Sequence, residues 1–214
     1  MFIKEGTTKT QGINRKNETE LDVKLQLGTG KLDLHDGTKE IMEGMFTFYG
    51  ESSEPEIAYD ISESGIGKLV VPQKSITTWL LKKAKQEWDV ALNGDLPLAL
   101  KVELGAGKSK LGLSKLNLKD LHIESGVGET EIDLAGEWKN SFRVKIDVGV
   151  GKMKIRVPIH AGVKVEVDKG IGKVKADHFI IVGDSYQNQS YETADVKLDI
   201  DLDVGVGEVI LEQV

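Results

Sequence analysis

The residues whose spacing in this sequence best suits catalysis are acidic side chains on one face of a predicted strand. Asp199, Asp201 and Asp203 alternate with aliphatic residues, so they share the outward face of a strand. Carboxylates at that spacing lie about 7 Å apart, within the range of the paired acids of sugar-cleaving enzymes. Three further charged residues are candidates to lie near them: Asp147, Arg143 and Arg156. One hypothesis is therefore a polysaccharide-active β-helix enzyme, a lyase or a hydrolase. The alternative is an ordinary solvated strand.

Metal and thiol chemistry find little support in the residue types. The four histidines are widely separated: His35, His122, His160 and His178. We expect His122, which alternates with Leu121 and Ile123, to be a lone surface side chain, because a metal site needs two or three converging ligands. The absence of cysteine excludes disulfides, thiolate zinc sites and thiol nucleophiles. We therefore expect no catalytic residue, no metal ligand and no cofactor.

Seven Gly-x-Gly triplets, each with a small or β-branched middle residue, are the most regular feature of the chain. Their glycines are Gly28 and Gly30, Gly65 and Gly67, Gly105 and Gly107, Gly126 and Gly128, Gly149 and Gly151, Gly170 and Gly172, and Gly205 and Gly207. A dinucleotide-binding fingerprint needs a third glycine and a following helix. Calcium-binding glycine-rich repeats need a nine-residue period with Asp close behind. Here strand patterns follow each triplet and Lys or Glu stands behind it, so we interpret the glycines as structural turns.

Each triplet coincides with a one-residue slip in the alternation of apolar and polar residues. Such a slip in a strand requires a bulge or corner, for which glycine is suited. Four consecutive triplets begin at residues 105, 126, 149 and 170, so the steps are 21, 23 and 21 residues. A near-constant period of this length is typical of stacked coils. We predict an all-β, right-handed parallel β-solenoid, or β-helix, with insertions; the handedness follows from the crossover rule.

The organisation predicted from these patterns has two parts. Residues 1–87 form a β-rich N-terminal domain continuous with the solenoid, and residues 88–214 form the C-terminal repeat domain. Insertions are expected at roughly 35–60, 73–87 and 179–195, the second with a short helix after Ser75. Residues 1–20 are either a flexible lead-in or a first strand that covers one end of the sheet.

Stacking in chain order predicts neighbours along the coils. The residue after each triplet forms a column: Lys31, Lys68, Lys108, Glu129, Lys152, Lys173 and Glu208. In this column we expect Lys152 to repel Lys173 weakly. The last coil, Val204 to Leu211, is expected at an open end, covered by the 179–195 insertion or by another copy of the chain. Three aromatic residues stand outside the alternation and either bind a partner or cap the core: Trp79, Tyr186 and Tyr191.

The composition of the chain argues against two classes of partner, nucleic acids and the interior of a membrane. The net charge is −7 and only three arginines are present, so binding to nucleic acid is disfavoured. No apolar run approaches the roughly 18 residues of a membrane-spanning helix, so we expect no membrane insertion by this chain. The polar first 20 residues lack the apolar core of a targeting segment.

Several segments resemble the toast-rack family of bacterial cell-envelope proteins, long known as domains of unknown function. They are Gly105–Ser109, Ile123–Glu129 and Val163–Val167 leading into Gly170–Gly172, with Leu27–Leu32, Pro55–Tyr59, Trp88–Leu92 and Pro97-Leu98 in the N-terminal part. The family is related to the C-terminal domain of membrane proteins that restrain envelope-stress two-component systems, and to DUF4097-like adhesins. The resemblance implies an extracytoplasmic, non-catalytic scaffold, or a stress-sensing accessory or adhesin-like domain. Such a domain would bind a protein or an envelope component, and no catalytic residues are implied.

Overall fold

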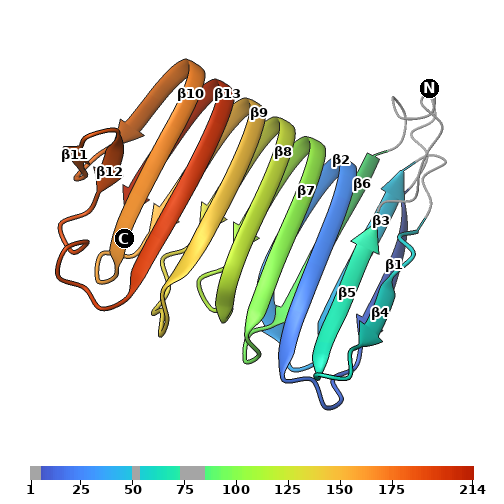
Figure 1. The fold of residues 1–214 in the computed structure, drawn as a ribbon. Helices are drawn as coiled ribbons and strands as arrows, with labels where there is room; N and C mark the ends of the chain where they lie inside the picture. Colours follow the sequence, from blue (N-terminus) through green and yellow to red (C-terminus); the bar gives the residue numbers. More distant parts are fainter. Residues whose placement is uncertain (1–5, 50–53, 73–84) are drawn as a thin grey trace, which may run out of the picture.

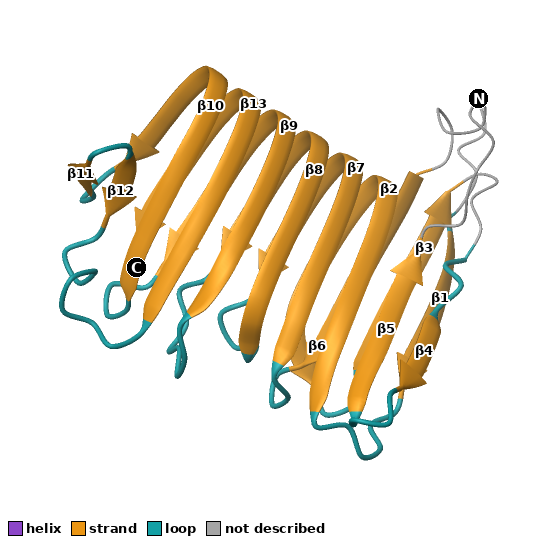
Figure 2. Cartoon of the chain, in the orientation of Figure 1, coloured by secondary structure: helices purple, strands orange, loops and turns teal. Residues whose placement is uncertain are grey.

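The computed structural model describes residues 6–49, 54–72 and 85–214. Every regular element in these ranges is a β-strand (Figure 2). The strands are β1 (Thr7–Ile13), β2 (Glu20–Thr38), β3 (Met42–Tyr49), β4 (Ala58–Ile61), β5 (Ile66–Pro72), β6 (Lys85–Asn93), β7 (Leu98–Gly112), β8 (Leu118–Asp133), β9 (Phe142–Val157), β10 (Gly162–Ala176), β11 (Ile180–Val182), β12 (Ser185–Gln187) and β13 (Lys197–Gln213). The helix predicted after Ser75 lies outside the described residues.

All 13 strands belong to one sheet, in the order β1-β3-β6-β2-β7-β8-β9-β13-β10-β12-β11, with β5 also on β2 and β4 on β5. The long strands from β2 to β10 are parallel, and antiparallel strands cover both ends of the row. The prediction of an all-β, mostly parallel fold is confirmed, whereas the right-handed sense stays a prediction. β1 pairs with β3 at one edge, so the N-terminal segment contains a first strand rather than a flexible lead-in.

Each long strand bends at its glycine triplet, so the sheet folds over into two layers (Figure 1). In β8, Leu121 and Ile123 are buried before the bend, and Thr130 and Ile132 are buried after it. Buried residues of an unbroken strand lie an even number of positions apart, whereas Ile123 and Thr130 are seven apart. This odd step is the predicted one-residue slip of the alternation. We call the halves before the bend the front layer and the halves after it the back layer. One hydrophobic core lies between the two layers.

Six of the seven triplets lie side by side along the bend. Their middle residues are in register: Thr29, Ala106, Val127, Val150, Val206 and Ile171. At this line the backbones approach too closely for side chains, since a Cβ atom on Gly128, whose φ is +148°, would fall on the carbonyl oxygen of Gly107. The Gly65–Gly67 triplet is not equivalent, because Gly67 pairs with Leu21 in the front layer, ahead of the bend. Its assignment to the same column, with Lys68, is therefore wrong.

The spatial order of the strands departs from chain order at β13, which lies between β9 and β10. Glu208 of β13 consequently lies between Lys152 and Lys173, and it forms an ion pair with Lys173 at 3.3 Å. The predicted repulsion between the two lysines is wrong, because an acidic strand separates them. The predicted open end at the last coil is also wrong, since both edges of β13 are paired. The end of the row is β10, and β12 from the 179–195 insertion pairs with it.

Two further predictions concern the division of the chain into domains and its insertion into a membrane. The proposed domain boundary between residues 87 and 88 falls within β6, and the division into two domains stays a prediction. In the described part of the chain, no helix has the length and apolarity to cross a membrane.

Candidate functional site

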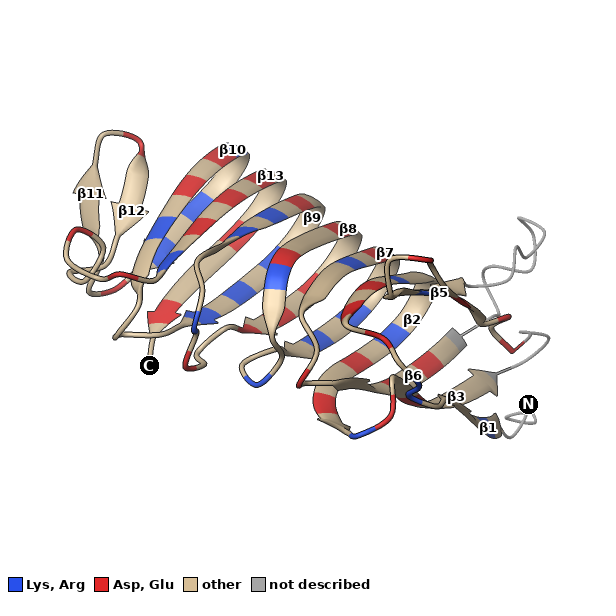
Figure 3. Cartoon of the chain, turned by 60° about the horizontal axis from the view of Figure 1, so that its bottom comes forward, with Lys and Arg blue, Asp and Glu red and all other residues tan. Residues whose placement is uncertain are grey.

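Two rows of mostly charged residues run across the strands of the front layer, on its outward, solvent-accessible face. Figure 3 colours the basic and acidic positions of the strands blue and red. The first row, in spatial order, is Lys24, Lys101, His122, Lys145, Asp201 and Glu166. The second row, two residues closer to the bend, is Gln26, Glu103, Glu124, Asp147, Asp203 and Asp168. From β2 to β9 the first row consists of lysines and His122, and from β7 to β9 the second row is acidic, with Gln26 at its β2 end. On β13 and β10 both rows are acidic.

Ion pairs connect the two rows at the β2 side. Glu103 lies 2.8 Å from Lys24 and 3.0 Å from Lys101, and Lys101 reaches Glu124 at 2.8 Å. Partial burial raises the pKa of Glu103, but hydrogen bonds from Lys24, Gln26 and Lys101 outweigh it and lower that pKa to about 2. Glu103 is therefore the best-anchored carboxylate of this face.

The Glu103→Gln substitution should make the free energy of unfolding less dependent on pH in the acidic range. A carboxylate whose pKa is lowered by folding stabilises the native state above its unfolded pKa of about 4.5, and that contribution fades as the pH falls towards 2. We expect the variant to be about 1 kcal/mol less stable than the parent at pH 7, with the difference shrinking below pH 4.5. Urea unfolding at pH 7 and pH 3 measures both values.

The control for this experiment is Glu131→Gln on the same sheet. Glu131 lies in register between Lys110 and Lys154, but no described lysine lies within 4.0 Å of its carboxylate, so this change should cost clearly less than Glu103→Gln at pH 7. Equal stability losses in the two variants at pH 7 would contradict the role given to Glu103.

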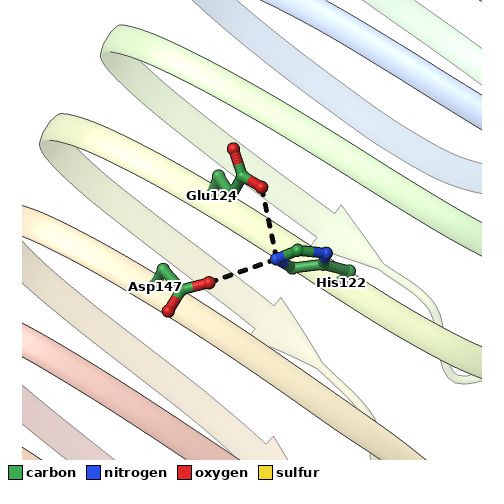
Figure 4. Close-up of side chains that lie close together, drawn as sticks. All are labelled: His122, Glu124 and Asp147. Carbon is green, nitrogen blue, oxygen red and sulfur yellow. Dashed lines mark hydrogen bonds and ion pairs between the residues drawn. The ribbon is translucent and has the colours of Figure 1, made fainter.

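His122 does not stand alone, contrary to the expectation from the sequence. Its Nε2 atom lies 3.3 Å from Oε1 of Glu124 and 3.1 Å from Oδ2 of Asp147 (Figure 4). Glu124 is two residues further along the same strand, and Asp147 is its register partner on β9. The signal that could have found this cluster is its spacing from the glycines, since Glu124 and Asp147 each stand two residues before a triplet.

The acidic residues considered for sugar cleavage are only partly brought together. Asp203 lies in register between Asp147 and Asp168, but Asp147 already contacts His122 and Lys145. Asp199 accepts a hydrogen bond from the Tyr191 hydroxyl at 2.8 Å.

The two arginines proposed to assist these acids lie in different layers of the sheet. Arg143 is in register with Asp199 and lines an open groove of about 440 Å³. Arg156 lies in the back layer, where it pairs with Asp133 at 2.9 Å. Of the predicted set, Asp199, Asp201 and Arg143 line this one groove, whereas Asp147, Asp203 and Arg156 are not part of its lining.

The end of the row at β10 differs from the rest of the surface. Exposed apolar side chains stand on β10 and on β11: Ile171 is 74% exposed, Ile181 69%, and Ile180 and Val182 52% each. A groove of about 810 Å³ between β10 and the β11–β12 hairpin is lined by Ile181 and Val182 and by acids of both rows. Among the described strands, none pairs with the outer edge of β10 from Val167 to Ala176. We call this region the β10 end face.

The predicted partner-binding aromatics have different surroundings. Tyr186 lies on β12, is half-buried and lines the groove of the β10 end face. Tyr191 is held within the chain: its hydroxyl bonds to Asp199, and the Lys197 Nζ atom lies 4.9 Å from its ring centroid. Partial burial and this bond to Asp199 raise the pKa of Tyr191. Trp79 lies outside the described residues. Partner binding through any of the three stays a prediction.

The fold defines the class of the protein as an all-β protein built on one large, mostly parallel sheet. Two family models match the sequence: the N-terminal domain of toast_rack, DUF2154, over residues 2–156, and the C-terminal region of the cell wall-active antibiotics response protein LiaF over residues 106–211. The chain belongs to the toast_rack family, and the resemblance seen in its sequence is confirmed. No curated protein matches the chain.

Solved structures of similar proteins extend this comparison. A candidate cell adhesion protein from Clostridium sporogenes ATCC 15579 is 31% identical, with a TM-score of 0.92 over 98% of this chain and 100% of its own. A candidate adhesin from Bacteroides fragilis NCTC 9343 is 12% identical, with a TM-score of 0.23 over 96% of this chain and 97% of its own. The latter score is too low to support an argument. The family descriptions and the name of the 31% identical protein mention no catalytic activity.

Proposed function

We propose that this protein is a non-catalytic cell-envelope module, a scaffold or a stress-sensing accessory or adhesin-like domain, that binds another protein through its β10 end face. The family match to a cell wall-active antibiotics response protein and the 31% identical candidate adhesion protein support an envelope context. The observation that carries the binding role is the unpaired outer edge of β10 beside exposed apolar side chains.

An unpaired strand edge favours an occupant that supplies backbone groups. Ten residues of β10, Val167 to Ala176, lack a strand on their outer side in the described chain. An extended segment of another protein can hydrogen-bond to such an edge, while pockets beside it select its side chains. Exposed Ile171 on β10, and Ile181 and Val182 of the hairpin in the neighbouring groove, offer apolar contacts to that segment.

Charge favours a different protein over a second copy of this chain. In the two-fold antiparallel register that sets Ile171 opposite itself, Lys169 of one copy faces Lys173 of the other. Like charges directly opposite each other are unfavourable in a sheet. Within the row, by contrast, Lys173 is matched by Glu208 of the neighbouring strand. We therefore propose an extended partner segment with an aliphatic residue facing Ile171 and acidic residues facing Lys169 and Lys173, whereas the acids of the groove disfavour further negative charge. Self-association through the end of the row is the other outcome of the test.

Site-specific photocrosslinking tests the proposal. A photoreactive amino acid replaces Ile171 at the β10 end face or, as the control, Val150, which is 46% exposed on the same bend but lies in the middle of the row. Because only Ile171 adjoins an unpaired edge, we expect one discrete adduct from Ile171 in cells of the source organism and none from Val150. Identical adduct patterns from both positions, or none from Ile171, would contradict the proposal.

The mass of the adduct separates the possible occupants. An adduct at twice the mass of the chain identifies a second copy and replaces the proposed partner with a homo-oligomer. For the alternative hypothesis of a polysaccharide-active enzyme, Asp201→Asn is the informative variant. Turnover of an acidic glycan that this substitution abolishes would favour the enzyme, which would use the groove that Asp199, Asp201 and Arg143 share. No turnover across a panel of glycans would count against it.

A further inference from the structure

We propose that His122, Glu124 and Asp147 form a zinc-binding site on the outward face of the front layer. All three ligand atoms lie within 4.8 Å of one another (Figure 4). One imidazole nitrogen and two carboxylate oxygens form a donor set that Zn²⁺ accepts in proteins. This site is separate from the β10 end face and does not depend on what binds there.

The distances within the cluster suit zinc coordination. Zinc–nitrogen and zinc–oxygen bonds of about 2.0–2.2 Å in a tetrahedral arrangement place neighbouring ligand atoms roughly 3.3–3.5 Å apart. The separations from His122 Nε2 are 3.3 Å to Glu124 and 3.1 Å to Asp147. Small side-chain rotations are therefore enough to admit the ion.

The sheet holds these side chains in place before any metal arrives. His122 and Glu124 are two residues apart on β8 and so face the same side. Asp147 is fixed opposite Glu124 by the parallel register of β8 and β9, which continues to the bend. Ligands on paired strands are held more precisely than ligands on loops.

The single hydrogen bond that His122 Nε2 can donate serves only one of the two carboxylates it faces, and Lys101 serves the other, Glu124. Nε2 of an imidazole carries at most one proton, yet here it faces two carboxylate oxygens. The other members of the first row between β2 and β9 are lysines, whose ammonium groups have three donors each. A divalent cation in front of Nε2 would satisfy the nitrogen lone pair and both carboxylates together.

Two lysines set the expected strength of the site. Lys101 lies 2.8 Å from Oε1 of Glu124, and Lys145 lies 3.5 Å from Oδ2 of Asp147. Their charges compete with the metal for the carboxylates, so the site is weaker than a structural zinc centre. The remaining coordination positions face solvent, where water or a carboxylate from a bound protein completes the shell.

Calorimetric titration of the tag-free, full chain with Zn²⁺ tests the site. We expect saturable binding of one ion, at least tenfold weaker binding in His122→Ala, and no change in His160→Ala, which removes an exposed histidine elsewhere. Lys145→Met should tighten binding several-fold, because it removes a competing charge. Melting temperatures without metal verify that each variant is folded.

The outcomes that would overturn the site are distinct. Absence of saturable zinc binding, or an unchanged isotherm in His122→Ala, removes the site. An Asp147→Asn variant that binds as tightly as the parent removes Asp147 from the ligand set and with it the proposed geometry. A second probe, Co²⁺, gives a ligand-field spectrum that should require His122.

Discussion

Gly128→Ala is expected to destabilise the protein by about 4 kcal/mol or more, a large part of the 5–15 kcal/mol typical of a folded domain. At φ +148° an L-residue is strained, and the added methyl would meet the backbone carbonyl of Gly107 on the neighbouring strand. Backbone cannot move aside there without separating β7 from β8. Urea or thermal unfolding of the variant should show a greatly lowered midpoint, or the chain should fail to accumulate as folded protein.

Gly112→Ala provides the matched control for that substitution. Gly112 also lies in a long strand, β7, but a Cβ on it would be 3.6 Å from the nearest atom, the carbonyl oxygen of Leu34, an ordinary contact. Its effect should stay within about 0.5 kcal/mol. If both glycine variants unfold at the same denaturant concentration, close backbone approach at the bend is not what selects glycine.

Asn93→Ala is expected to cost about 3 kcal/mol. The Asn93 side chain is fully buried and joins two loops at the N-terminal end of the row. Its Nδ2 atom donates to the carbonyl oxygens of Lys39 and Glu40 at 2.9 and 3.0 Å, and its Oδ1 atom accepts from the amides of Asp95 and Leu96 at 2.9 and 3.2 Å. Alanine leaves all four backbone groups without these partners.

Asn117→Ala is the control that shows how much stability is lost when a side-chain amide with only one hydrogen bond is removed. Asn117 donates one longer bond, 3.4 Å, to the carbonyl oxygen of Asp95. Asn117→Ala should therefore lower the free energy of unfolding by less than about 1 kcal/mol. Losses of similar size in the two asparagine variants would show that the four-bond junction at Asn93 is not a principal source of stability.

The sequence was informative where a local rule determines geometry. Alternation with a slip at the glycines predicts which side of β8 is buried, because the two-residue period of a strand permits no other arrangement. The neighbours of a strand obey no such rule. Spacing along the chain placed β10 next to β9, whereas the structure inserts β13, whose Glu208 suits the lysines on both sides.

The two candidate sites, the His122 cluster and the β10 end face, also differ in whether a local rule of the sequence predicts them. The cluster around His122 depends on the register of two strands, which follows from counting back from the glycine triplets, although the sequence alone did not lead us to it. The β10 end face depends on which strand comes last in the row, which no local pattern specifies. In the sequence, its Tyr186 differs from its neighbours only as an aromatic residue outside the alternation.

The position of β13 has a consequence for how the chain folds during synthesis. β10 leaves the ribosome before β13, so at that stage the free edge of β9 is available to it in the register that β13 later occupies. That early pairing would set Lys152 beside Lys173 and would have to be exchanged when β13 arrives. Repulsion between the two lysines weakens the premature pairing at the bend, whereas in the front layer the exchange sets Asp203 of β13 between Asp147 and Asp168.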